Sequence, residues 1–555
     1  MNMKTKIYAL LLSAALFTVS CSDFLDNDFN STITGQTLSD DNLPALVSPL
    51  YNKVWFDFND KFYYGLGDGM SYNLLARTSD YVYPFMDLQV NGLTGPLNSA
   101  WSSFYVVVGQ STAAINTIEA GSSARSVKDQ YIAEARFMRG TAYWHLASLW
   151  RDVPIVEDAA AAAANPLQNT NPQKDVYEYA IRDLEFAAKY LPETSSQAGR
   201  VNRYSAFGML SRIYLAYSGF VASNYGENPN VGTRDQAYLD LAKKAAEMVI
   251  NHSSFQLMNN YPDLFMIENN NNSESMFAFQ WIPGLNNDTG YGVINSQQAY
   301  FAANSAITGD DAAWGGYVFC TYDVLKEYEL NDTIRRKATW MGYGDFYPEI
   351  DKADNGYLCQ LNASGNASTD LCVKKGVVGS KDDNPAIGRM NSALDNYMLR
   401  LAEVYLNYAE AILGNQPSTS DVVALEYFNK VRERAGLNPK SSITWEDIRH
   451  ERRTEFCMEG RYWYDLVSRA YYKQQEVINY INGQNRGTIP AYLFTAPNNL
   501  RNDPNRSPGT RAVGKADAST FKLPYPETDL IMDPKLSDPP VPFTFAEEKI
   551  TDLFE

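Results

Sequence analysis

The densest group of charged side chains in the sequence is ITWEDIRHERRTEFCMEGRYWYDLVSR, residues 443–469. In a helix, side chains three or four positions apart lie on neighbouring turns, so Arg452 faces Glu455 and Glu455 faces Glu459. Arginine forks that meet carboxylates beside aromatic rings favour a partly buried ion-pair network that fixes neighbouring segments. The alternative interpretation is that these arginines contact a ligand.

Motifs for catalysis or metal binding are weak throughout the chain. The three histidines, His145, His252 and His450, lie in or at the end of predicted helices, and none has a second histidine or a cysteine at ligand spacing. We interpret His145 as a core residue. The stretch DKADNGYLCQLN fails as a calcium loop because Ala353 and Asn362 occupy its third and twelfth positions. The sequence therefore predicts no cofactor and identifies no set of metal ligands.

No nucleophile or phosphate-binding motif is present either. The chain has no G-x-S-x-G, no Walker loop and no G-x-G-x-x-G that opens a helix after a strand. A carboxylate pair for glycoside hydrolysis stays open, since separation in space decides that chemistry. With 65 acidic residues, however, no pair stands out.

Aromatic residues offer a different chemistry, the binding of sugars. A sugar ring has an apolar C–H face that an aromatic ring can cover, and hydroxyls that Asn, Asp and Arg can bind. Five of the nine tryptophans fall in predicted helices and are expected in the core: Trp101, Trp144, Trp150, Trp445 and Trp463. The others, outside predicted helices, are Trp55, Trp281, Trp314 and Trp340. Each is either a binding platform or a ring that packs its own loop.

We choose Trp281 and Trp314 as the first platform candidates. The remaining ligand-binding candidates are rings of the same region and polar or amphipathic residues of the loop GDGMSYNLLARTSDYVYPF: Tyr291, Tyr317, Tyr343, Asp68, Asn73, Arg77 and Tyr83. These residues are chosen for their side-chain chemistry alone. No catalytic residue is assigned.

Helical periodicity dominates two regions that would position these loops, residues 101–261 and 393–470. In both, apolar residues recur at i, i+3, i+4 and i+7. Gly414 is placed to cap one helix, and Gly460 to break or bend another. The pairs resemble tetratricopeptide repeats without a clean 34-residue period. We therefore predict an all-α fold of irregular tetratricopeptide-like repeats, in about four helix pairs.

Two other regions, residues 262–392 and 471–555, are rich in Gly, Asn, Asp, Pro and aromatic residues. Long irregular segments in a compact protein are usually functional, so 262–392 is the expected ligand-binding insertion and 471–555 a C-terminal segment. Within the insertion, Cys359 and Cys372 are close enough in sequence to form a loop disulfide in an oxidising location. A rigid helical scaffold that carries aromatic loops favours a binding protein.

Residues 1–20 have the pattern of a secretory signal. Lys4 and Lys6 precede an apolar run too short to span a bilayer. Cys21 then stands where bacterial lipoproteins receive their lipid, although Thr18 replaces the usual leucine. The alternative is an ordinary signal peptide. We expect a soluble chain anchored by lipid on Cys21, with residues 21–100 forming a tether and an N-terminal region.

Charge narrows the possible partners. The formal net charge of the 555 residues is −18. Phosphate groups are bound by Lys and Arg, so this balance argues against nucleic acid or anionic lipid headgroups.

A family resemblance joins these observations. ERRTEFCMEGRYWYDLVSR closely resembles the E-R-R-x-E-x-x-x-E-G-x-R-x-x-D-L pattern of the SusD/RagB family of surface nutrient-binding lipoproteins. CSDFLD resembles the lipidated start of that family. EARFMRGTAYWHLASLWRDVPIV is similar to its arginine-rich helix, with Arg151 in place of the usual glycine. MLRLAEVYLNYAEAIL and KLPYPETDLIMDPKL resemble later family segments, in the same order.

The resemblance implies a helical fold of four irregular repeat pairs with a variable insertion that holds the ligand. It further implies a position outside the outer membrane, where such proteins cap a TonB-dependent (SusC-like) transporter. They capture oligosaccharides or, in some members, peptides. The acids after Cys21 look like the surface-export signal of these lipoproteins. We thus expect a protein that binds an oligosaccharide or polysaccharide without transforming it.

Two alternatives remain. A secreted glycoside hydrolase would place two carboxylates beside the aromatic loops. A helical-repeat scaffold would bind other proteins, and Trp281 and Trp314 would then be packed down.

Overall fold

The computed structural model describes most of the chain after the N-terminal segment. The described residues are 39–77, 80–282, 294–302, 305–309, 317–360, 371–388, 391–486, 488–489, 492–496, 499–502, 509–510 and 513–554. The predicted signal, Cys21 and the candidates Tyr291 and Trp314 lie outside this part.

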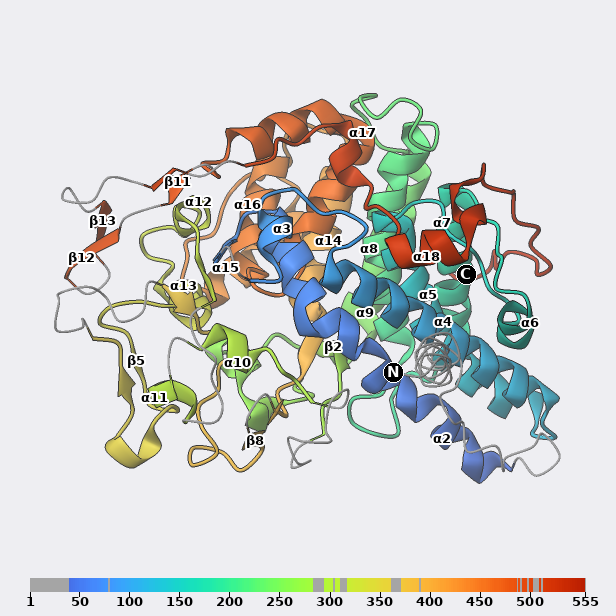
Figure 1. Ribbon diagram of the computed structural model, residues 1–555, viewed down its shortest axis with the longest axis horizontal. Helices are drawn as coiled ribbons and strands as arrows, with labels where there is room; N and C mark the ends of the chain where they lie inside the picture. Colours follow the sequence, from blue (N-terminus) through green and yellow to red (C-terminus); the bar gives the residue numbers. More distant parts are fainter. Residues whose placement is uncertain are drawn as a thin grey trace, which may run out of the picture.

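Long helices form the scaffold (Figure 1). They are α4 (Gly95–Ala120), α5 (Arg125–Leu149), α7 (Gln173–Tyr190), α8 (Arg203–Ala222), α9 (Gln236–His252), α14 (Leu401–Leu413), α15 (Val422–Arg434), α16 (Trp445–Glu455) and α17 (Tyr462–Gly483). Capping boxes begin α8, at Asn202, and α16, at Thr444, as expected where a polar side chain satisfies the first amides. Gly414 ends α14, and Gly460, with φ +64°, separates α16 from α17, so both glycine predictions are confirmed.

Most of the long helices pack against the helices that precede and follow them in the chain. Helix α5 contacts α4 and α7, α8 contacts α7 and α9, and α14 contacts α8, α9 and α15. The contact between α9 and α14 joins segments that residues 253–400 separate in sequence. The two predicted helical regions are therefore one scaffold, and the predicted all-α, tetratricopeptide-like fold is confirmed. None of the helices described here is long and apolar enough to cross a membrane.

Short elements occupy the insertion and the ends of the chain. The helices are α2 (Leu43–Val47), α3 (Tyr83–Met86), α6 (Ala159–Ala164), α10 (Gln298–Phe301), α11 (Ser305–Thr308), α12 (Tyr322–Leu325), α13 (Thr333–Thr339) and α18 (Glu527–Met532). The two-residue strands outside the main sheet are β5 (Phe346–Tyr347), β6 (Tyr357–Leu358), β8 (Ile387–Gly388), β9 (Asn391–Ser392), β11 (Thr488–Ile489) and β14 (Gly509–Thr510). Strands β12 (Tyr492–Ala496) and β13 (Asn499–Asn502) pair antiparallel. Helices α10 to α13 lie to the left of α4, α5, α7, α8 and α9 in Figure 1.

Two sheets tie the insertion to the rest of the fold. One has the order β1–β3–β7–β4, in which β1 (Leu74–Ala76) of the N-terminal region pairs with β3 (Val318–Cys320). Strands β7 (Cys372–Val373) and β4 (Trp340–Met341) complete it. Cys359 and Cys372 are buried thiols here, so the disulfide considered from the sequence is not formed.

The second sheet corrects a predicted boundary. Strand β2 (Ser275–Phe279) pairs antiparallel with β10 (Asn396–Arg400), where helical periodicity had been extended back to residue 393. A short apolar run is compatible with a helix or with a strand, and here the pairing with β2 stabilises the strand. Helix α14 consequently begins at Leu401, directly after the strand.

The predicted core role of His145 is confirmed. Its ring stacks on Phe104 with centroids 4.9 Å apart, and its Nδ1 lies 2.7 Å from the Tyr464 hydroxyl. Burial lowers the pKa of His145 well below its usual value. The imidazole is therefore neutral at neutral pH and acts as a packed aromatic ring.

Candidate functional site

The charged motif of α16 builds an internal ion-pair network. Arg400, at the end of β10, is buried and donates to Glu274 at 2.8 Å, Glu455 at 2.6 Å and Glu459 at 2.9 Å. Arg335 of α13 is fully buried and lies 2.6 Å from a carboxylate oxygen of Glu451. The ion-pair interpretation is therefore confirmed, although these partners come from other elements rather than from neighbouring turns of one helix.

Electrostatics keeps the network charged. Burial alone would raise the pKa of Glu455, but the guanidinium groups of Arg434, Arg400 and Arg335 hold it at about 2. Opposite charges at this range favour the ionised carboxylate. Because Arg400 and Arg335 are enclosed, they cannot reach a ligand in this structure.

Two residues predicted for the ligand rim, Asp68 and Asn73, instead hold the chain together. The Asp68 carboxylate accepts hydrogen bonds from the amides of Met458 and Gly460 and from the Asn73 side chain, each at 2.9 Å. Asn73 accepts in turn from Nε of Arg453 at 2.9 Å. Burial raises the pKa of Asp68 to about 6. Both side chains are fully buried, so this geometry gives them a packing role rather than ligand contact.

Trp281 is likewise packed down. Its side chain is 5% exposed, and its indole N–H donates to the Asn396 side chain at 2.9 Å. The rings of Phe56 and Phe279 meet it edge-on. Trp281 lies two residues after the end of β2, the strand that pairs with β10. It offers no open face to a sugar, which is what the scaffold alternative expects of this residue; Trp314 lies outside the described residues.

Arg77 and Tyr317 do come together, at the edge of the β1–β3 sheet. The Arg77 amide donates to the Tyr317 carbonyl at 3.0 Å, which continues the strand pairing. The exposed Arg77 guanidinium lies 5.6 Å from the centre of the Tyr317 ring and 5.7 Å from that of Phe319. It makes no hydrogen bond or ion pair with a residue in the described ranges. This guanidinium is therefore available to a ligand.

A second cation extends the same surface. The Lys61 ammonium, paired with Asp60, lies 4.4 Å from the centre of the Tyr300 ring and 5.3 Å from that of Tyr81. Burial lowers the pKa of Lys61, but the Asp60 carboxylate outweighs burial, so the pKa stays above its usual value. The ring centres of Tyr300 and Tyr317 are 6.4 Å apart, so these rings connect the surroundings of Lys61 with those of Arg77.

We call this surface the aromatic–cation cluster: Lys61, Arg77, Tyr81, Tyr300, Tyr317 and Phe319. Its outermost ring, Tyr81, is 63% exposed. Alternating rings and cations suit a ligand with apolar faces and many hydrogen-bond acceptors, as a sugar has. Within the described ranges, no group of three or more His, Cys, Asp or Glu side chains is placed to hold a metal ion.

Comparison with known proteins decides the family. A SusD-like protein of Bacteroides ovatus is 38% identical over 566 residues, covering 98% of this chain and 99% of that protein. The chain belongs to the SusD family. The profile described as SusD family matches residues 320–540, and the one described as starch-binding, associating with outer membrane, matches residues 26–215.

Relatives of the SusD family with known ligands are also similar to the chain. A solved structure described as containing xylogluco-oligosaccharide is 38% identical, has a TM-score of 0.82, and covers 91% of this chain and all of that one. Starch-binding protein SusD of Bacteroides thetaiotaomicron is 22% identical over 372 residues, covering 60% of this chain and 63% of that protein. A laminarin binding SusD-like protein, 20% identical with a TM-score of 0.65, shares the fold.

In this SusD family member the remaining candidates sit apart from the cluster or at its border. Tyr83 is half-buried at the start of α3. Tyr343 is also half-buried. Strands β3 and β4 are both antiparallel to β7, so they run in the same direction. Because Tyr317 precedes β3 and Tyr343 follows β4, the two tyrosines lie at opposite ends of the sheet. The structure thus unites Arg77 and Tyr317 and leaves Tyr343 aside.

Four members of the cluster were missed from the sequence: Lys61, Tyr81, Tyr300 and Phe319. Tyr81 lies two positions before the chosen Tyr83, and Pro84, in the first turn of α3, was the available signal that the residues before it form an entry to a helix. Lys61 and Tyr300 are distant in sequence and carry no local signal, because only the tertiary fold brings them together.

Proposed function

We propose that this protein captures an oligosaccharide or polysaccharide at the cell surface through the aromatic–cation cluster, without catalysis. The observation that carries the proposal is the cluster itself, in which an exposed tyrosine and an uncommitted arginine lie on one surface. Membership of a family described as starch-binding supports it.

The ligand is held by two kinds of contact. Tyr81 and Tyr317 cover the apolar faces of sugar rings, and burial of each face stabilises the complex through the hydrophobic effect and dispersion. Arg77 donates hydrogen bonds to hydroxyl oxygens, and its planar fork fixes the orientation of the ring. Trp314 remains our candidate for a further platform, and Tyr291 for a further ring.

The first glycan to test is of the xyloglucan type. The relative whose structure contains xylogluco-oligosaccharide matches this chain over nearly its whole length at 38% identity. A long glucan-based chain presents successive flat ring faces, which Tyr81 and Tyr317 can cover.

The N-terminal sequence and the family support a location for this capture. Lipid on Cys21 anchors the chain in the outer membrane, on its outer side, and a TonB-dependent, SusC-like transporter receives the bound glycan. The signal-like residues 1–20 and the family description of association with the outer membrane support this placement. Each buried methylene of the lipid contributes about 0.8 kcal/mol to anchoring.

The test uses the purified chain without residues 1–21, titrated with a panel of polysaccharides and oligosaccharides by calorimetry. We expect saturable binding of one glycan class, no bond cleavage, and at least a tenfold loss of affinity in Tyr81→Ala, which is about 1.4 kcal/mol. Tyr190→Ala is the matched control, because Tyr190 is an exposed tyrosine on α7. It should bind like the wild type.

Other outcomes separate the alternatives. Release of products would show a hydrolase. Binding of peptides but of no glycan would show a peptide-binding family member, and binding of neither would favour the protein scaffold. Equal affinity of Tyr81→Ala and wild type for a glycan would exclude Tyr81 as a platform.

A further inference from the structure

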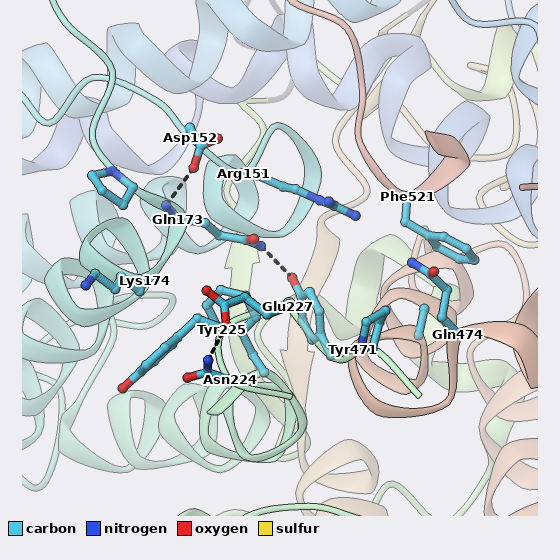
Figure 2. Close-up of a pocket in the computed structure, with 15 residues that line it drawn as sticks. Arg151, Asp152, Gln173, Lys174, Asn224, Tyr225, Glu227, Tyr471, Gln474 and Phe521 are labelled. Carbon is cyan, nitrogen blue, oxygen red and sulfur yellow. Dashed lines mark hydrogen bonds between the residues drawn. The ribbon is translucent and has the colours of Figure 1, made fainter. Parts of the chain in front are cut away.

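A cavity of about 570 Å³ lies away from the aromatic–cation cluster, where α7, α8 and α17 meet (Figure 2). Its walls come from the start of α7, the turn after α8, one face of α17 and the segment after α5. The cluster, by contrast, is built from the N-terminal region, α10 and β3. The cavity is therefore a separate site on the helical scaffold, of a size that binds small ligands.

Arg151 projects into this cavity. Figure 2 shows its guanidinium extending toward Phe521 and Gln474. Its Nε is buried, and the side chain makes no hydrogen bond or ion pair with any residue of the described ranges. A buried donor without a partner destabilises the fold, because it has given up its hydrogen bonds to water. An acceptor from a bound ligand would remove that destabilisation.

Backbone strain gathers around the same cavity. Arg151, Asn224 and Tyr225 all have left-handed backbone conformations, with φ of +70°, +51° and +56°, and Gly226 follows at +91°. Side chains other than glycine rarely adopt such angles, and strain of this kind concentrates at functional sites. The left-handed conformation of Arg151 accompanies a guanidinium that enters the cavity, and that of Tyr225 accompanies a ring at the rim of the cavity.

The cavity wall carries two cations, Arg151 and Lys174, and two acids, Asp152 and Glu227. Asp152 accepts a hydrogen bond from the Gln173 amide at 2.9 Å and lies 3.7 Å from Lys522. Glu227 accepts from the Asn224 side chain. Lys174, like Arg151, has no ion pair with a described residue and faces the Tyr225 ring at 5.9 Å. Both acids therefore have polar partners, whereas the Arg151 guanidinium has none among the described residues and is the donor that an anionic group entering the cavity would meet.

The remaining wall suits a sugar ring. Tyr225 is 46% exposed and offers a face, while Phe521 and Tyr471 supply apolar surface deeper in the cavity. The Gln474 side chain makes no hydrogen bond with a described residue and can bind a hydroxyl.

We propose that this cavity is a second ligand site, which binds a short saccharide that carries a carboxylate, such as a uronic acid unit. Arg151 binds the carboxylate through its fork, which is the strong geometry for an arginine and a carboxylate. Tyr225 covers a ring face, and Gln474 binds a hydroxyl. The site does not depend on the proposed glycan binding at the aromatic–cation cluster.

The test uses the chain without residues 1–21 and two probes of equal length, a digalacturonate and a neutral galactose disaccharide. Binding is followed by calorimetry at low salt. The decisive variant is Arg151→Gly, which removes the guanidinium and suits the left-handed backbone at this position. We expect its thermal midpoint to equal or exceed that of the wild type, and its affinity for digalacturonate to fall at least tenfold.

Two further variants locate the ligand. Arg125→Gln, an exposed arginine at the start of α5, controls for general charge and should bind digalacturonate like the wild type. Tyr81→Ala should also leave digalacturonate binding unchanged, even where it abolishes neutral glycan binding. These results together would support a second acidic-saccharide site that operates independently of the first.

Several outcomes would overturn the proposal. They are the absence of digalacturonate binding, equal affinity for the neutral disaccharide, unchanged affinity in Arg151→Gly, and loss of digalacturonate binding in Tyr81→Ala. Capture of an acidic peptide in place of the saccharide would also overturn it and would make the cavity a protein-docking site.

Discussion

Arginine does opposite things in two regions of this molecule. Around Arg400 and Arg335, guanidinium groups are buried and each meets two or more carboxylates. At Arg77 and Arg151, guanidinium groups reach a surface or a cavity and meet no carboxylate among the described residues. The first arrangement fixes the fold, and the second leaves donors for a ligand.

The buried region shows how the insertion is held to the scaffold. Arg335 belongs to α13 in the insertion, while its partners Glu451 and Glu455 belong to α16 in the scaffold. Arg400 connects β10 to the same helix. An ion pair in a low-dielectric interior is weak evidence for net stability, but removal of one partner leaves an uncompensated charge. The network therefore specifies how these segments dock.

The largest expected effect is the loss of Arg400. Arg400→Met takes one shared guanidinium from three buried carboxylates, Glu274, Glu455 and Glu459, and leaves the network with an uncompensated negative charge, so we expect the free energy of unfolding to fall by about 3–5 kcal/mol. Urea unfolding followed by circular dichroism measures it. The control is Arg125→Met, because Arg125 and Glu119 form an exposed pair with 58% and 43% of their side chains accessible. Such pairs contribute about 0–1 kcal/mol. Equal losses in the two variants would contradict the distinction between the regions.

Acid provides the next test of the buried region. The pKa of Glu455 is about 2 in the folded protein, below its value of about 4.3 in the unfolded chain. Because the folded pKa is depressed, the stabilisation is complete above the unfolded pKa and is lost as the pH falls through the folded pKa. The difference corresponds to about 3 kcal/mol. We expect the stability gap between wild type and Glu455→Gln to be largest above pH 5 and to shrink towards pH 2.

Urea titrations at several pH values between 2 and 7 measure this gap. Glu119→Gln, from the exposed pair, should differ from the wild type by less than about 1 kcal/mol at every pH. A Glu455→Gln gap that stays constant down to pH 2 would show that the network does not hold Glu455 ionised.

A close backbone approach beside the network gives a smaller expected effect. A Cβ on Gly67 would lie 2.1 Å from the carbonyl carbon of Gly460, so the N-terminal segment and the turn between α16 and α17 meet without room for a methyl group. Overpacking typically costs about 1–3 kcal/mol, and Gly67→Ala should destabilise at least that much because both neighbours are backbone. Gly109→Ala is the control, since nothing lies within 4 Å of its added methyl group in α4. Gly109→Ala should leave the thermal midpoint of unfolding unchanged or raise it. A thermal midpoint of Gly67→Ala equal to that of the wild type would refute the close approach.

The parts of the fold that depend on local sequence patterns could be predicted, and the parts that depend on distant contacts could not. Helix ends such as Gly414 and the helical stripes depend on residues within a few positions, so the scaffold could be predicted from the sequence. The strand at Asn396–Arg400 could not, because β2, its partner, lies more than a hundred residues away. Asp68 was mistaken for a ligand contact for the same reason: it is bonded to the amide of Met458, 390 positions along the chain. A choice made from side-chain chemistry alone cannot distinguish a buried hydrogen-bond acceptor from an exposed one.

The smallest change in stability is expected at the cluster, where the contrast with Arg400 is sharpest. Arg77→Gln removes a guanidinium that has only ring contacts, and an exposed cation–π contact contributes about 0.5–1 kcal/mol. We expect the free energy of unfolding to change by less than about 1 kcal/mol, while affinity for the glycan falls about tenfold. Urea unfolding and calorimetry on the same preparation measure both quantities. A large loss of stability would make Arg77 a structural residue like Arg400, whereas unchanged glycan affinity would remove it from the binding surface.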